Sequence, residues 1–214
     1  MTVRVECVVT AGRVDASAQD GEHEIETNVW IVGDDEEVVV IDAAHDASAI
    51  LSAVGDREVL AVVCTHGLPA HVNAAIEVSE RDEALVAVHP KDRMLWDAIY
   101  PDRVPDIEIE QGGILEVAGE QLDVLHTPGH TPGGVSLYAA GLETVFTGRT
   151  LGKSGPGSVE GAYGDFPTLL TAIGEQLLTL PGGTRVLPGG GEETTIEAQD
   201  ANFDAWISQD PDQE

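Results

Sequence analysis

The stretch that most constrains the fold is the eight-residue run Cys64-Thr65-His66-Gly67-Leu68-Pro69-Ala70-His71. It follows an apolar segment, Glu58 to Cys64, which is typical of a buried strand that ends in a turn carrying two histidines. A segment with helical spacing, Asn73 to Arg81, comes directly afterwards. A strand that leads into a histidine-bearing loop and then into a helix holds imidazoles rigidly over a pocket. The run therefore predicts a functional site at the end of this strand.

Two later loops are expected to belong to the same pocket. One is Leu125-His126-Thr127-Pro128-Gly129-His130-Thr131-Pro132-Gly133, and the other is Phe146-Thr147-Gly148-Arg149-Thr150. Histidine titrates near neutral pH and serves as an acid, a base or a metal ligand. The planar guanidinium of arginine binds carboxylates and phosphates through two hydrogen bonds.

Together these loops resemble the motifs of the metallo-β-lactamase superfamily, on its glyoxalase II-like branch. The family's motifs are His-x-His-x-Asp-His, a lone His in a Thr-Pro-Gly-His-Thr-Pro-Gly loop, Gly-Asp-Thr with a metal-bridging Asp, and a late Gly-His-Gly. More loosely, Val38 to Ala44 and His71 to Ala75 look like the mycothiol-linked thioester hydrolases of this branch. The resemblance implies an α/β protein with a four-layer αββα sandwich, the metallo-β-lactamase fold, and descent from a two-metal hydrolase.

The chain lacks several residues of these motifs. Its version of the family's metal-binding motif is therefore degenerate. Leu68 stands where the family has His, Ala70 where it has Asp, Arg149 where it has the bridging Asp, and Gly190 where it has the last His. The histidines that remain at ligand positions are His66, His71 and His130. A two-metal hydroxide needs carboxylate charge to balance two dications, and Arg149 adds a permanent positive charge instead.

Three functions remain open from these departures. In the favoured one, the enzyme needs no cofactor: Arg149 supplies the positive charge, and His66, His71 and His130 act as general acids or bases on an acyl, thioester or carboxylate-bearing substrate. In the second, the three histidines hold one zinc ion as a thioester or lactone hydrolase. In the third, the chain is a binding protein without catalysis. The simplest alternatives are histidines without a role and an Arg149 that faces solvent or pairs with Asp42.

Several neighbours are expected to support the site. The resemblance implies that Asp42 and His126 brace the histidine-bearing loops, although Asp42 also fits a turn or helix-capping residue. Leu68 is expected to give the pocket an apolar floor. Gly152 to Gly164 is expected to form a loop over the pocket in which Lys153 and Tyr163 contact the substrate; an ordinary exposed loop is the alternative.

Length and charge limit the expected domain organisation and the expected kind of partner. The 214 residues suit one domain, 1–214, built from two β-then-α halves that meet near residues 101–106. The formal net charge of −29 repels nucleic acid and anionic membranes, which leaves a small anionic or acyl substrate as the expected partner. A homodimer stays open. The N-terminal segment lacks the pattern of a signal peptide, and no stretch has the length of a membrane span, so a cytoplasmic location is expected.

Overall fold

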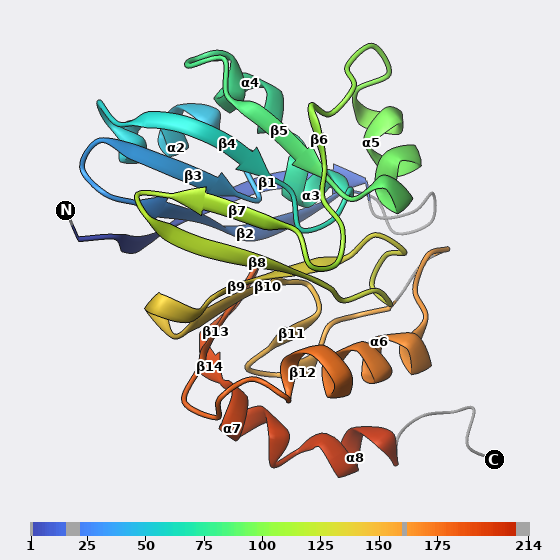
Figure 1. The fold of residues 1–214 in the computed structure, drawn as a ribbon. Helices are drawn as coiled ribbons and strands as arrows, with labels where there is room; N and C mark the ends of the chain where they lie inside the picture. The colour runs from blue at the N-terminus through green and yellow to red at the C-terminus, as the bar shows by residue number, and fades with distance from the viewer. Residues whose placement is uncertain (1, 16–21, 160–161, 209–214) are drawn as a thin grey trace.

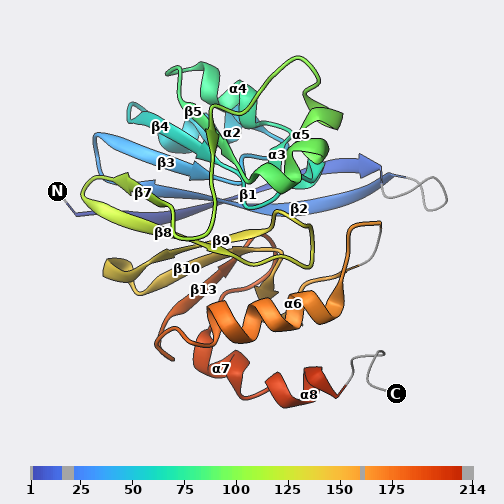
Figure 2. The ribbon, with the colours of Figure 1, turned by 45° about the vertical axis from the view of Figure 1, so that its right-hand side comes forward.

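The computed structural model describes residues 2–15, 22–159 and 162–208. Two mixed sheets lie face to face, and helices cover the outer face of each sheet (Figure 1). The second view shows the same four layers from the side (Figure 2). The four-layer αββα sandwich expected from the sequence is therefore confirmed.

The first sheet is built by the N-terminal half and has the order β1-β2-β3-β4-β5-β6. The strands β1, β2 and β3 pair antiparallel, whereas β3, β4, β5 and β6 run parallel. Their bounds are Arg4–Asp15, Glu22–Gly33, Glu37–Ile41, Glu58–Val63, Leu85–Val88 and Ile107–Glu108. The parallel strands β3 and β4 end at the same edge of the sheet, so the residues that follow them lie side by side there.

The second sheet has the order β14-β13-β10-β9-β8-β7. In chain order its strands β7, β8, β9, β10, β13 and β14 span Ile114–Val117, Glu120–His126, Val135–Ala139, Thr144–Gly148, Arg185–Pro188 and Thr194–Thr195. A short hairpin outside this sheet pairs β11, Leu151–Gly152, with β12, Gly155–Pro156. The hairpin begins one residue before the segment Gly152 to Gly164, which the sequence predicts as a loop over the pocket, and overlaps its start.

The alternation of buried side chains explains why the sheets stack. In β3, Val39 and Ile41 pack between the sheets with Phe146 of the second sheet, whereas Val38 and Val40 pack beneath the outer helices. Helices α2 (Ala47–Val54), α3 (Pro69–Val72), α4 (Ala75–Glu80) and α5 (Arg93–Ile99) follow strands of the first sheet. Helices α6 (Phe166–Ala172), α7 (Ile196–Asp200) and α8 (Phe203–Ile207) belong to the outer layer of the second.

Helical segments of both outer layers are interrupted in the structure. The helix predicted over Asn73 to Arg81 begins earlier as α3, because Pro69 starts a turn at its first position, and it resumes as α4. In the other layer, α6 passes into a π-helical segment, Ile173–Leu177. The C-terminal helical segment divides into α7 and α8.

Hydrogen bonds also join the two halves of the chain. The backbone N–H of Val135 donates to the carbonyl of Thr65 at 2.8 Å, and that of Asn28 donates to the carbonyl of Gly189 at 3.1 Å. Among the described residues, none of the helices combines the length and apolar character needed to cross a bilayer.

Candidate active site

Asp42, directly after β3, is the centre of a buried polar cluster. Its backbone is left-handed, with φ 58°, and the residue is 1% exposed. Its Oδ1 accepts the backbone N–H of Thr65 at 2.7 Å, and its Oδ2 accepts the Thr65 hydroxyl at 2.8 Å. Oδ2 also lies 2.9 Å from Nδ1 of His71. These contacts fix the histidine-bearing loop to the end of β3, while Asp46 rather than Asp42 caps helix α2.

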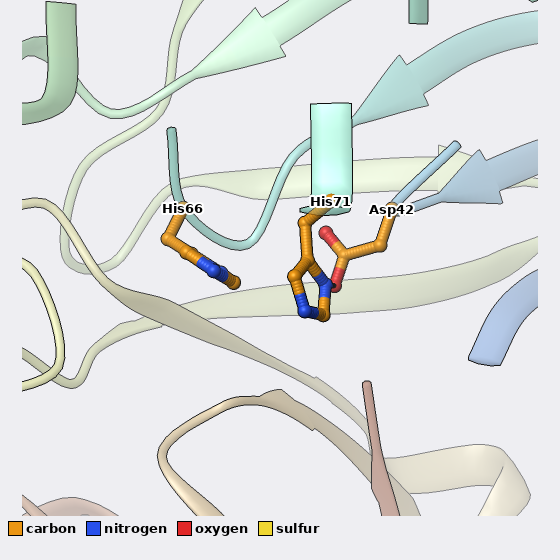
Figure 3. Close-up of side chains that lie close together, drawn as sticks. All are labelled: Asp42, His66 and His71. Carbon is orange, nitrogen blue, oxygen red and sulfur yellow. Dashed lines mark hydrogen bonds and ion pairs between the residues drawn. The ribbon is translucent and has the colours of Figure 1, made fainter. Parts of the chain in front are cut away.

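The same hydrogen bonds assign the protons on two imidazoles. In Figure 3 the ring of His71 lies beside Asp42, and the ring of His66 lies on the other side of His71. Because the Thr65 hydroxyl donates to Asp42, its oxygen accepts the Nδ1 proton of His66, 3.0 Å away. His71 donates its Nδ1 proton to Asp42. Both rings therefore keep an unprotonated Nε2. Nε2 of His66 is buried and has no hydrogen-bond partner among the described residues.

A third imidazole comes from the other half of the chain. His130 lies in the loop between β8 and β9, and its ring centroid is 4.9 Å from that of His66, edge to face. The centroids of His66 and His71 are 4.3 Å apart. Nδ1 of His130 donates to the carbonyl of Ser158 at 2.5 Å, which leaves its Nε2 unprotonated as well. Three imidazoles from two halves thus converge with free basic nitrogens.

Arg149, after β10, is half-buried beside this cluster, and among the described residues its guanidinium has no hydrogen-bond or ion-pair partner. Burial lowers the pKa of Arg149, and the nearby charge of Asp42 opposes this shift, but the two residues do not form an ion pair. Carboxylates pair directly with Arg4, Arg57, Arg81, Arg93, Arg103 and Arg185. In a chain with 39 acidic residues, an arginine that none of the described carboxylates pairs with is open to an external anion.

Burial sets the charge of the cluster. It lowers the pKa of His66 and His71 well below the usual value, and neighbouring imidazoles and Arg149 lower both pKa values further. Burial lowers the pKa of His130 too, with the Ser158 hydrogen bond opposing the shift. Burial raises the pKa of Asp42 to about 6, although His66, Thr65 and Arg149 act in the opposite direction. At neutral pH the imidazoles are therefore neutral bases and Asp42 is mostly ionised.

A cavity of about 220 Å³ adjoins Arg149 on the side of the β11–β12 hairpin. The three imidazoles are not part of its lining, so Arg149 connects the cavity with the histidine cluster. Lys153 and Glu192 line the cavity and contact each other. The remaining lining is mostly glycine, serine and proline from 148–158 and 188–191.

The other residues predicted to form or support the site do not line this cavity. Leu68 is half-buried and accepts the N–H of His71 through its carbonyl, and it does not line this cavity. Tyr163 is 39% exposed and does not line it either. His126 stacks on His89 at 4.5 Å, with an angle of 6° between the rings, and its Nε2 donates to the carbonyl of Pro132 at 3.0 Å. His126 therefore braces the loop that carries His130.

Asp92 is a connecting residue that the sequence analysis did not single out. It is fully buried, and its carboxylate accepts hydrogen bonds from the N–H of Gly67, the hydroxyl of Thr131 and the N–H of Gly133, at 2.8, 2.7 and 2.6 Å. Gly67 follows His66, and Thr131 follows His130, so one carboxylate joins the two histidine-bearing loops. In the sequence Asp92 appears only as the start of a helix, and no local pattern indicates its distant partners.

Some side chains of the buried cluster could coordinate a metal ion. Among the described residues, the group that could hold one is Asp42, His66 and His71, and His130 is not part of it. Both oxygens of Asp42 already accept hydrogen bonds, one of them from His71 itself. This buried group could hold a metal ion. The hydrogen bonds already made by Asp42 and the positive charge of Arg149 both weaken the attraction for a cation there.

Comparison with known proteins shows the family. The sequence model of the metallo-beta-lactamase superfamily matches residues 24–190, and the chain belongs to this superfamily. The metallo-β-lactamase fold expected from the sequence is thereby confirmed. A solved structure, that of the BLEG-1 B3 metallo-beta-lactamase, superposes with a TM-score of 0.76 at 26% identity over 90% of this chain and 97% of that one.

Two of the similar curated proteins carry hydrolase names, and a third is uncharacterized. The probable metallo-hydrolase YqgX of Bacillus subtilis is 32% identical over 193 residues, which cover 83% of this chain and 92% of the relative. The hydroxyacylglutathione hydrolase GloC of Haemophilus influenzae is 29% identical over 188 residues, 79% of this chain and 87% of the relative. An uncharacterized protein of Aquifex aeolicus is 32% identical over 185 residues, 80% of this chain and 88% of the relative.

Proposed function

We propose that this superfamily member is an enzyme that binds a carboxylate-bearing, acyl or thioester substrate on Arg149 and acts on it by acid-base chemistry without a metal pair. The relatives named as hydrolases support hydrolytic descent. The observation that carries the proposal is the half-buried guanidinium of Arg149, which lacks a carboxylate partner among the described residues and adjoins both a cavity and three imidazoles. In this arrangement Arg149 supplies the positive charge in place of metal ions.

The hydrogen bonds divide the work among the side chains. His71 is the imidazole best placed to accept a proton at Nε2, because Asp42 contacts its Nδ1–H and stabilises the imidazolium that forms. The unpartnered Nε2 of His66 can accept a hydrogen bond from water or from the substrate. Arg149 holds the anionic or polarised oxygen of the substrate, where it stabilises negative charge in the transition state. His130 borders His66 from the opposite loop.

The experiment that tests this proposal is an anion titration of Arg149→Ala, with Arg103→Ala as the matched control. Arg103 is exposed and pairs with Glu80. Calorimetric affinity for butyrate is expected to fall about tenfold or more in Arg149→Ala, as for loss of a charge-assisted contact, and to stay unchanged in the control. Equal affinity in both variants would refute the proposal.

Turnover separates an enzyme from a binding protein. On a panel of acyl thioesters, His71→Asn should abolish hydrolysis while keeping butyrate affinity, because the substitution removes the proton acceptor and leaves the guanidinium. If the wild-type protein binds butyrate and hydrolyses none of the thioesters, the binding protein becomes the better account.

A one-zinc hydrolase is the second candidate. The buried, unpartnered Nε2 of His66 and the metallo-hydrolase name of one relative favour it. Its activity would be lost to a chelator and restored by zinc.

A further inference from the structure

The cavity beside Arg149 brings a second cation close to the same ligand space. Its walls are the β11–β12 hairpin and the segment from Pro188 to Glu192. Arg149 is half-buried, whereas the Lys153 side chain is 58% exposed. Arg149 therefore lies deeper and Lys153 lies nearer the opening. Lysine occurs in this chain only at positions 91 and 153, so the placement of one beside Arg149 is unusual for such an acidic protein.

The backbone of Lys153 is held firmly although its side chain is exposed. The hairpin pairs Gly152 with Gly155, and Nε2 of Gln199 donates to the carbonyl of Lys153 at 3.4 Å. The ring of Trp206 lies 3.1 Å from the position that a Cβ atom would take at Gly155. These contacts with the C-terminal helices fix the hairpin, and with it the point from which the ammonium group reaches over the cavity.

The present partner of Lys153 is exchangeable. Its ammonium contacts the carboxylate of Glu192, another residue of the cavity wall, whose side chain is 74% exposed. An ion pair this exposed to water is weak and is readily replaced by another carboxylate. Glu192 thus occupies the place that an anionic group of a ligand would take on Lys153.

We propose that the cavity binds a short dicarboxylate, with one carboxylate on Arg149 and the other on Lys153 after it exchanges with Glu192. The inference rests on the proposed function, since both use Arg149. The volume of about 220 Å³ lies below the range of roughly 300–1,000 Å³ usual for pockets of larger ligands, which favours a chain of a few carbons. The glycine-rich wall adds little side-chain bulk and gives the chain between the two carboxylates room.

Paired probes test this inference. Succinate and butyrate have the same number of carbons and differ by one carboxylate. Calorimetry on the wild-type protein should show succinate binding about tenfold more tightly than butyrate. Lys153→Ala should lower the succinate affinity to the level of butyrate and leave butyrate unchanged, and the control Lys91→Ala should behave as wild type.

Glu192→Gln tests whether the Glu192 carboxylate competes with the ligand for Lys153. Removing the competing carboxylate should tighten succinate binding about threefold and leave butyrate unchanged, because an exposed ion pair has a free energy of this order. Equal affinities of the wild-type protein for succinate and butyrate, or unchanged succinate binding in Lys153→Ala, would overturn the inference while the Arg149 site stands. Butyrate binding that survives Arg149→Ala would instead refute the proposed function. Failure of both probes to bind the wild-type protein would overturn both.

Discussion

Nη1 of Arg149 lies 3.0 Å from the position that a Cβ atom would take at Gly190. A side chain at position 190 and the guanidinium of Arg149 would therefore compete for the same space. The absence of a side chain at position 190 therefore leaves room for the guanidinium of Arg149.

The first prediction follows from this contact. Gly190→Ala should push the guanidinium away and lower the affinity for butyrate about three- to tenfold, with little loss of stability because the end of a flexible side chain can move. Gly183→Ala is the matched control, since a Cβ atom there meets nothing within 4 Å. Unchanged butyrate affinity in Gly190→Ala would show that the position of Arg149 does not matter for binding.

Asp92 gives a prediction about the joining of the two histidine-bearing loops. Asp92→Ala leaves two buried backbone N–H groups and one hydroxyl without an acceptor, so the free energy of unfolding should fall by about 3 kcal/mol or more. Asp97→Ala, which removes only an exposed pair with Arg93, should cost under about 1 kcal/mol. Urea titrations of both variants measure the difference, and similar losses would contradict the bridging role.

Substitutions of Thr65 test the hydrogen bonds that link Asp42 to His66. Thr65→Val removes the hydroxyl that donates to one and accepts from the other, and should destabilise the fold by about 2 kcal/mol. Thr65→Ser keeps both hydrogen bonds and should preserve the protonated nitrogen of His66 as seen in ¹⁵N spectra of the imidazoles. The chain of bonds would be wrong if the valine variant showed the same His66 spectrum as the wild-type protein.

The buried imidazoles make stability depend on pH. Because the folded pKa of His66 and His71 lies well below 6.5, acidification through that value protonates these groups in the unfolded chain only, and the free energy of unfolding falls. Asp42, with its pKa raised to about 6, acts in the opposite direction, because the folded protein takes up its proton first. His66 and His71 against Asp42 give a net fall of about 1.4 kcal/mol per pH unit between pH 6 and 5, and His130, whose pKa burial also lowers, adds to this fall.

Urea denaturation at pH 7, 6 and 5 measures this slope. In His71→Asn the slope of the unfolding free energy against pH should decrease by the contribution of one bound proton. The substitution removes one of the groups that are protonated only in the unfolded chain. Stability that stays constant or increases on acidification would contradict the assigned charge states.

Much of the architecture could be predicted because it follows from local patterns. The apolar run from Glu58 to Cys64 predicted β4 to within one residue of its observed bounds. The helical interruptions were missed because they depend on packing: the break between α3 and α4 and the π-helical turn after α6 have no clear counterpart in hydrophobic spacing.

The site was harder to predict than the fold. Motif spacing indicated His66, His71 and His130, and the structure brings their rings together. The approach of the Arg149 guanidinium to Gly190 and the three hydrogen bonds of Asp92 involve residues that are far apart in sequence, so no local pattern could reveal them. The tautomers of His66 and His71 likewise depend on which groups surround Thr65.

Metal content tests most directly the central claim that Arg149 supplies the positive charge in place of a metal ion. Tag-free protein, purified without added zinc, would be measured by elemental mass spectrometry before and after dialysis against zinc. The account predicts a small fraction of an equivalent of any transition metal, unchanged by the dialysis, because Asp42 is already hydrogen-bonded and Arg149 opposes a cation. About one equivalent of zinc or iron, bound tightly enough to survive a desalting column, would contradict it and favour the one-zinc hydrolase.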